Sequence, residues 1–214
     1  MLGTNLLGRP IEYSMSRVSS DPIKRACDIV GATILLVFFL PVLLLTGGLI
    51  KLESRGPVLF RQSRGGLNGR SFTIYKLRSM HCEENGDIVA QAVRNDSRIT
   101  RVGAFIRATS IDELPQLLNV LKGDMSLVGP RPHARAHDAY YSALIPGYDV
   151  RLRARPGLTG LAQIKGLRGA TTELEDMTAR VKADVEYINS WSLLSDLRIL
   201  LLTAPHLIIT RNAY

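Results

Sequence analysis

The sequence has few cysteines and few aromatic residues. Its 214 residues include only two cysteines, Cys27 and Cys82, in unrelated contexts, so neither a disulfide framework nor the paired spacing of a zinc site is visible. This cysteine usage is typical of a reducing compartment. Phe, Trp and Tyr make up only 6% of the residues, which leaves few platforms for stacking on single-stranded nucleic acid.

Basic and apolar residues are abundant, and they stand apart from each other. The formal net charge is +8 and the pI is about 9.8, while hydrophobic residues make up 46% of the chain. A basic surface of this kind suits an acidic partner, which can be nucleic acid, anionic lipid or a phosphorylated substrate. The length allows one domain with a membrane element.

An uncharged apolar run covers residues 29–50 and is long enough to cross roughly 30 Å of hydrocarbon as one helix. Pro41 lies in its middle, where it removes a helical hydrogen bond and forces a kink or a break, and basic residues flank both ends. We therefore expect a re-entrant membrane helix, broken at Pro41, that enters and leaves from the same cytoplasmic face. A single span and a buried core helix are the alternatives. Lys51 and Glu53 follow directly, which disfavours a cleaved signal peptide.

A β-hairpin is predicted after this segment. Residues 58–62 and 72–80 have strand character, and the glycine-rich stretch between them can reverse the chain. In the second strand Lys76 and Arg78 share a face, because side chains alternate along a strand. Such a pair of cations can receive a phosphate. It can equally mark a solvated edge strand that carries charge against aggregation.

The most informative stretch covers residues 110–132. Its two adjacent carboxylates, Asp112 and Glu113, stand where a helix is expected to begin, and a rigid Pro-Arg-Pro corner at 130–132 closes it. We interpret the stretch as an active-site helix. Taken alone, Ser110 and Glu113 also fit an ordinary capping box.

Three further features lie nearer the C-terminus. His133 and His137 stand four residues apart, but no third metal ligand is patterned with them, so we interpret them as residues of a helix surface. Arg155 opens a second rigid turn. Residues 191–209 are apolar and interrupted at Pro205, which favours an interfacial membrane helix, with a packed terminal helix as the alternative.

Taken together, these features carry a family resemblance. Beside the apolar segment with its proline, the landmarks are residues 75–80 (YKLRSM), 107–116 (RATSIDELPQ), 123–132 (GDMSLVGPRP), 155–157 (RPG) and 212–214 (NAY). In this order they resemble the bacterial sugar transferases, which are monotopic phosphoglycosyl transferases. Members of that family move a sugar phosphate from a nucleotide sugar to a polyprenyl phosphate.

The resemblance implies roles for individual residues. Asp112 would be the nucleophile that attacks the sugar-bearing phosphorus of a UDP-sugar, with Glu113 beside it as the second catalytic carboxylate. Mg²⁺ would be the cofactor, bound by the same two carboxylates, because hard oxygen ligands suit this ion. The residues that would bind substrate are Lys76, Arg78, Arg107, Arg131, Arg155 and Asp196.

The resemblance also implies an organisation and a location. We expect an α+β fold: a small, mainly helical catalytic domain with a β-hairpin, the re-entrant helix broken at Pro41, and interfacial amphipathic helices. Residues 1–22 would be a flexible lead-in, 23–52 the membrane helix and 53–214 the cytoplasmic catalytic domain. The protein would be monotopic in the bacterial inner membrane. Its partners would be a UDP-sugar, undecaprenyl phosphate and membrane lipid, not nucleic acid, and it could form a homodimer.

The identity of the sugar depends on two short tracts. Residues 130–134 and 168–177 look similar to the branch that transfers glucose 1-phosphate in exopolysaccharide and capsule assembly. Transfer of galactose 1-phosphate is the alternative, because epimers are distinguished by a few hydrogen bonds. A membrane-anchored basic binding module, or an inactive scaffold subunit, would need neither Asp112 nor Glu113.

Overall fold

The chain folds into a mostly helical body under one long arching helix. The computed structural model describes residues 16–81, 96–167, 169 and 173–209, and of 204–209 only the backbone. The α-helices are α1 (Arg17–Ser20), α2 (Pro22–Glu53), α3 (Arg101–Ala108), α4 (Leu117–Lys122), α5 (Arg135–Leu144), α6 (Leu161–Ile164), α7 (Leu174–Ser190) and α8 (Leu193–Ile209). Three 3₁₀ helices are η1 (Leu67–Gly69), η2 (Ile111–Gln116) and η3 (Tyr148–Arg153).

The predicted β-hairpin is confirmed. Strand β1 (Leu59–Gly65) pairs antiparallel with β2 (Ser71–Leu77), and η1 makes the turn between them. A second, parallel pair joins β3 (Ser126–Val128) to β4 (Gly157–Thr159) and was not predicted. The two backbones approach closely here, since a Cβ on Gly157 would lie 2.1 Å from the Gly129 amide nitrogen.

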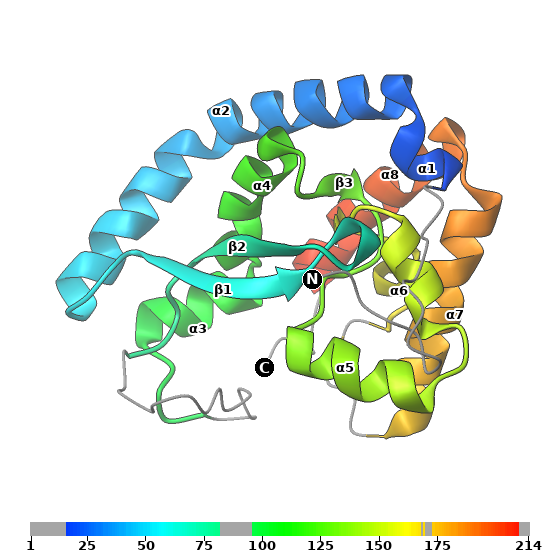
Figure 1. Cartoon of the computed structure of the whole chain (residues 1–214). Coiled ribbons are helices and arrows are strands. Elements are labelled where there is room, and N and C mark those ends of the chain that lie inside the picture. Colours follow the sequence, from blue (N-terminus) through cyan, green and yellow to red (C-terminus); the bar gives the residue numbers. More distant parts are fainter. Residues whose placement is uncertain (1–15, 82–95, 168, 170–172, 210–214) are drawn as a thin grey trace.

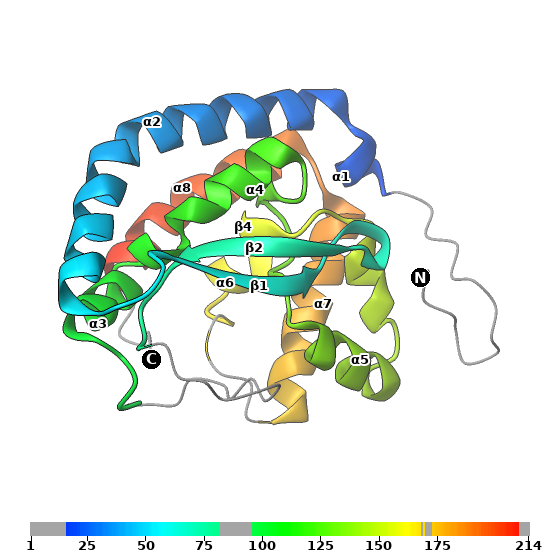
Figure 2. The same ribbon diagram turned by 60° about the vertical axis from the view of Figure 1, so that its left-hand side comes forward.

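Helix α2 is continuous through Pro41, so the predicted break in the helix is wrong. Instead, the helix bends as it arches over α4 and α8 (Figures 1 and 2). Losing one hydrogen bond at a proline bends a helix when the neighbouring turns stay paired. The apolar side chains along the arch are exposed, with Val37 at 68% and Phe38 at 72%. Within the described residues, α2 alone is long and apolar enough to cross a membrane.

Both ends of α2 are fastened to the same helical body. Near its start, the Arg25 guanidinium donates 2.7 Å to the Val120 carbonyl at the end of α4. At its end, Glu53 accepts a hydrogen bond of 2.8 Å from the Arg101 amide at the start of α3. Both ends of α2 are therefore attached to one body, against which the inner face of the helix also packs.

Side chains from most elements form the main core. Buried apolar residues of α2, β2, α4, α7 and the loop before β3 meet there, among them Ala32, Ile74, Leu117, Tyr187 and Met125. The core lies under α2, beside the hairpin. Burial of this apolar surface fixes the position of the hairpin relative to α4.

The structure also tests the predictions for the two ends of the chain, the N-terminal lead-in and the C-terminal helix. Part of the predicted lead-in is packed, because Ser19 of α1 is buried and its hydroxyl accepts a 3.0 Å hydrogen bond from the Arg155 amide. The rest of it, residues 1–15, lies outside the described residues, as do residues 82–95. Helix α8 continues through Pro205, so the predicted interruption there is wrong. Its Leu194 and Leu201 are exposed.

Candidate active site

Asp112 and Glu113 lie in η2, a six-residue 3₁₀ helix, not at the start of a longer α-helix as predicted. Ser110 precedes them in the left-handed conformation (φ 58°), and its side chain makes no capping bond to η2. Such a conformation in a non-glycine residue is strained and is often found at functional sites. Helix α4 begins only at Leu117. The helix dipole therefore contributes little here, and side chains must supply the positive charge.

Two cations from separate elements hold Glu113. Lys76 of β2 places Nζ 2.8 Å from Glu113 Oε1. Arg131, from the Pro-Arg-Pro corner, binds both carboxylate oxygens, with Nη2 2.6 Å from Oε1 and Nη1 3.3 Å from Oε2. The bidentate geometry is the strong form of this ion pair. The structure thus brings together three residues predicted for the site from distant parts of the sequence.

Asp112 has no such partner. Its carboxylate is buried and makes no hydrogen bond or ion pair with any residue in the described parts of the chain. Burial, followed by repulsion from Glu113, raises the pKa of Asp112 to about 6, although Lys76, Arg107 and Arg131 oppose the shift. Arg107, predicted for the site and placed on α3, thus acts on Asp112 through its charge. A carboxylate with this pKa is ionised at neutral pH and is available to bind or react.

This pKa predicts how the carboxyl group titrates. Because the folded value lies above the ordinary value of 3.8, Asp112 stays protonated up to about pH 6 and becomes a carboxylate above it. Carbon-13 NMR of labelled, metal-free protein in detergent should show an Asp side chain that titrates near pH 6 and belongs to Asp112. In an Asp112→Asn variant this transition should be missing. If every Asp resonance titrates below about pH 4.5, the environment described for Asp112 is wrong.

Asp112 and Glu113 are the residues that could together hold a magnesium ion. Mg²⁺ is usually held by one or two carboxylates together with substrate phosphates. The unpartnered Asp112 offers oxygen ligands, and a cation beside it would relieve the repulsion from Glu113 that raises its pKa. Within the described residues, no group of three or more His, Cys, Asp or Glu side chains forms a metal site. A bound Mg²⁺ would therefore rely on this pair and on the substrate.

Arg78 and Arg155, also predicted to bind substrate, hold main-chain segments. The Arg78 guanidinium donates 2.8 Å to the Ser54 carbonyl, beyond the end of α2. Arg155 donates 2.7 Å to the Ser19 carbonyl and 3.1 Å to that of Gly123. The structure therefore gives both arginines a role in fastening the N-terminal helices to the body of the fold.

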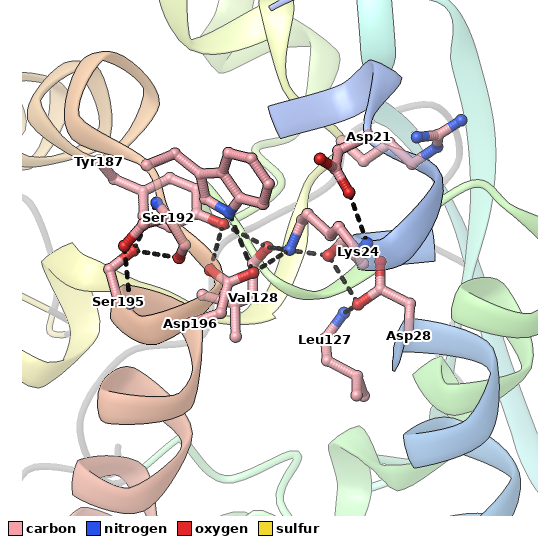
Figure 3. Close-up of polar contacts among 12 residues, drawn as sticks. Asp21, Lys24, Asp28, Leu127, Val128, Tyr187, Ser192, Ser195 and Asp196 are labelled. Atoms are coloured by element: carbon pink, nitrogen blue, oxygen red, sulfur yellow. Dashed lines mark hydrogen bonds and ion pairs between the residues drawn. The ribbon is translucent and has the colours of Figure 1, made fainter. Parts of the chain in front are cut away.

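Asp196, the remaining predicted residue, is the centre of a buried network (Figure 3). It lies 2.6 Å from Lys24 Nζ on α2 and accepts hydrogen bonds from Tyr187 (2.8 Å) and the Trp191 indole (3.1 Å). Lys24 also donates 3.1 Å to the carbonyl of Val128. This network joins α2, α7, α8 and β3, and none of these contacts involves Asp112 or Glu113.

The sequence analysis missed a second buried network behind Arg131. His133 is 5% exposed, so its interpretation as a helix-surface residue is wrong. Its Nδ1 lies 2.8 Å from Arg151 Nη1 and 2.7 Å from the Tyr148 hydroxyl. Arg151 also binds Asp184 at 3.0 Å and donates 2.5 Å to the Arg131 carbonyl. Burial and the charge of Arg151 hold the pKa of His133 well below its usual value. No local sequence signal reveals partners this far apart.

Comparison with known proteins places the chain in a family. Residues 19–210 match the model of the family described as bacterial sugar transferase. A UDP-glucose:undecaprenyl-phosphate glucose-1-phosphate transferase of Caulobacter vibrioides is 62% identical over 200 residues, which cover 94% of this chain and 75% of the relative.

Two further relatives are longer than this chain. The Escherichia coli (strain K12) protein of the same name is 50% identical over 90% of this chain and 41% of its own length. An Aeromonas hydrophila UDP-N-acetylgalactosamine-undecaprenyl-phosphate N-acetylgalactosaminephosphotransferase is 46% identical over 85% of this chain and 42% of its own length. Since the family model and these identities cover most of the 214 residues, the chain belongs to the bacterial sugar transferase family.

Proposed function

We propose that this transferase moves glucose 1-phosphate from UDP-glucose to undecaprenyl phosphate and releases UMP, as the first membrane step of exopolysaccharide synthesis. The names of the Caulobacter and Escherichia relatives support glucose as the sugar. The observation that carries the chemistry is Asp112, a buried carboxylate without a partner in the described residues, surrounded by the charges of Lys76, Arg107 and Arg131.

The first step uses Asp112 as a nucleophile. One of its oxygens attacks the sugar-bearing phosphorus, the bond from that phosphorus to the bridging oxygen breaks, and UMP leaves with the bond electrons. The sugar phosphate remains on the carboxylate. A carboxylate attacks a phosphate diester poorly unless nearby cations reduce the negative charge. Lys76, Arg107 and Arg131 supply that charge, and Glu113 orients two of them.

The second step regenerates the carboxylate. An oxygen of undecaprenyl phosphate attacks the phosphorus of the intermediate, the bond to Asp112 breaks, and the product is the lipid diphosphosugar. Two sequential transfers through one covalent intermediate predict ping-pong kinetics. Mg²⁺, held by Asp112 and Glu113 with the substrate diphosphate, would add positive charge beside the reacting phosphate.

The arch of α2 supports a re-entrant membrane topology. Its exposed apolar side chains suit lipid, while both of its ends are tied to one body through Arg25 and Glu53. A straight span would place those ends on opposite sides of the bilayer. We place the catalytic body on the cytoplasmic face of the inner membrane, with the exposed leucines of α8 at the interface.

Cysteine labelling tests this topology. Cys27 is an exposed free thiol near the start of α2, and a Lys51→Cys substitution would place a thiol near its end. With Cys82 replaced by serine, we expect neither thiol to react with a membrane-impermeant maleimide in intact spheroplasts. Both should react after lysis. Labelling of just one of the two positions in intact spheroplasts would contradict the re-entrant topology and support a single span.

The function itself is tested by UMP release. Detergent-purified protein is incubated with Mg²⁺, undecaprenyl phosphate and, in separate reactions, UDP-glucose, UDP-galactose and UDP-N-acetylgalactosamine. With UDP-glucose, we expect UMP release beyond one equivalent per protein molecule only when the lipid is present, and no release when EDTA replaces Mg²⁺. Release with another UDP-sugar alone would keep the reaction and overturn the choice of sugar. No release from folded protein with any of the three would contradict the proposed function.

A further inference from the structure

Arg64 lies at the end of β1, beside the corner that carries Arg131. Along β1, Gln62 and Arg64 are half-buried, whereas Arg61 is exposed. The backbone of Arg64 forms an antiparallel bridge with Ala134, just after the Pro-Arg-Pro corner. The position of Arg64 in the fold is therefore set by the segment that also positions a cation of the active site.

The charge of Arg64 is not neutralised in the described residues. Its one described side-chain hydrogen bond runs from Nη2 to the neutral Gln62 Oε1, at 2.5 Å. Its Nε is buried and has no hydrogen-bond partner in the described parts of the chain. No carboxylate there lies within the 4.0 Å of an ion pair. A buried N–H donor without an acceptor, on a charged group, destabilises the fold unless a ligand supplies the acceptor.

A neighbouring cation, Arg131, increases this imbalance. Arg131 already gives its guanidinium to Glu113, at 2.6 Å. Burial, and after it the positive charge of Arg131, hold the pKa of Arg64 below its usual value, and Asp138 and Glu113 offset this only in part. Asp138 is itself engaged by the Tyr148 hydroxyl at 2.8 Å. Two arginines that repel each other are stabilised by an anion bound between them.

We propose that Arg64 binds a phosphate group of a substrate together with Arg131, and so belongs to the substrate-binding residues of this site. The proposal rests on the proposed function. Guanidinium groups bind phosphate oxygens through two parallel hydrogen bonds, which would satisfy the unmet Nε donor. The phosphate can come from the diphosphate of the UDP-sugar or from the polyprenyl phosphate.

The test compares Arg64→Gln with Arg61→Gln. The two substitutions remove the same charge from the same strand, but Arg61 is on the exposed face, over the Tyr75 ring. KM is measured separately for UDP-glucose and for undecaprenyl phosphate. We expect Arg64→Gln to raise one KM by roughly 10- to 100-fold, the effect of losing a charged hydrogen bond, while Arg61→Gln changes neither beyond about twofold. The substrate whose KM rises is the one whose phosphate Arg64 binds.

Melting temperatures measured on the same samples separate binding from folding. If Arg64→Gln leaves both KM values unchanged, the proposal is overturned, and a lowered melting temperature would then assign Arg64 to the fold. Failure of the proposed function looks different, because the wild type itself would release no UMP. Calorimetric titrations with UDP and with undecaprenyl phosphate would then decide: weaker binding of either ligand by Arg64→Gln than by Arg61→Gln supports the anion site, and equal binding of both ligands overturns it.

Discussion

Replacing Asp112 with asparagine is expected to reduce UMP release by at least about 1,000-fold, because an amide of the same shape is not a nucleophile. The same change should leave the melting temperature equal or higher. Burial raises the pKa of Asp112 to about 6, so at neutral pH the ionised carboxylate destabilises the fold, and asparagine removes that charge. A variant that loses activity but keeps its stability identifies a residue that serves function at some cost to the stability of the fold.

Asp149 provides the matched control. Burial also raises the pKa of this carboxylate, but it lies in η3 and no charged neighbour contributes to its shift. Asp149→Asn should therefore change UMP release by no more than about twofold, while its effect on stability resembles that of Asp112→Asn. Residual activity of Asp112→Asn above about a tenth of the wild-type rate would show that another group performs the chemistry.

The second large effect is expected from Asp196→Ala, as a loss of stability. Lys24 would remain buried, with 5% of its surface exposed, and would lose its 2.6 Å partner. Leaving a buried charge unpaired costs roughly 3–5 kcal/mol, which lowers the melting temperature of a chain of this size by about 10 °C. Thermal unfolding in detergent, followed by circular dichroism, measures the shift.

Glu186→Ala is the control for that experiment. Glu186 and Lys165 also form a 2.6 Å ion pair, but their side chains are 56% and 44% exposed, and such a pair contributes at most about 1 kcal/mol. Replacing both buried partners, with Lys24→Met and Asp196→Leu, should recover much of the stability, since no lone charge remains. An Asp196→Ala variant of normal stability with a raised KM for undecaprenyl phosphate would instead support the substrate role implied by the family resemblance.

The elements that could be predicted are those with local signals. The glycine-rich turn between two strand-like runs predicts the hairpin, and apolar length predicts α2. Pro41 does not break that helix, because the other turns keep their backbone hydrogen bonds and the helix only bends. Tertiary contacts fix both of its ends. Strands β3 and β4 have three residues each, which is too short for any periodic pattern.

The same distinction holds for the site. Lys76 and Arg131 could be assigned to the site because each lies in a motif that carries the family resemblance. The roles of Asp196 and Arg155 in holding helices together depend on partners more than 130 positions away, Lys24 and Ser19. The sequence shows which residues are charged, but only the folded structure shows which of them face the reacting groups.

The most direct test of the covalent mechanism is intact-protein mass spectrometry of the purified transferase mixed with UDP-glucose and Mg²⁺ in the absence of lipid. The account predicts a mass increase of one hexose phosphate, located on the peptide that contains Asp112, together with a matching amount of UMP. Addition of undecaprenyl phosphate should remove the adduct. Protein that stays unmodified, and releases UMP only when the lipid is present, would contradict the two-step mechanism.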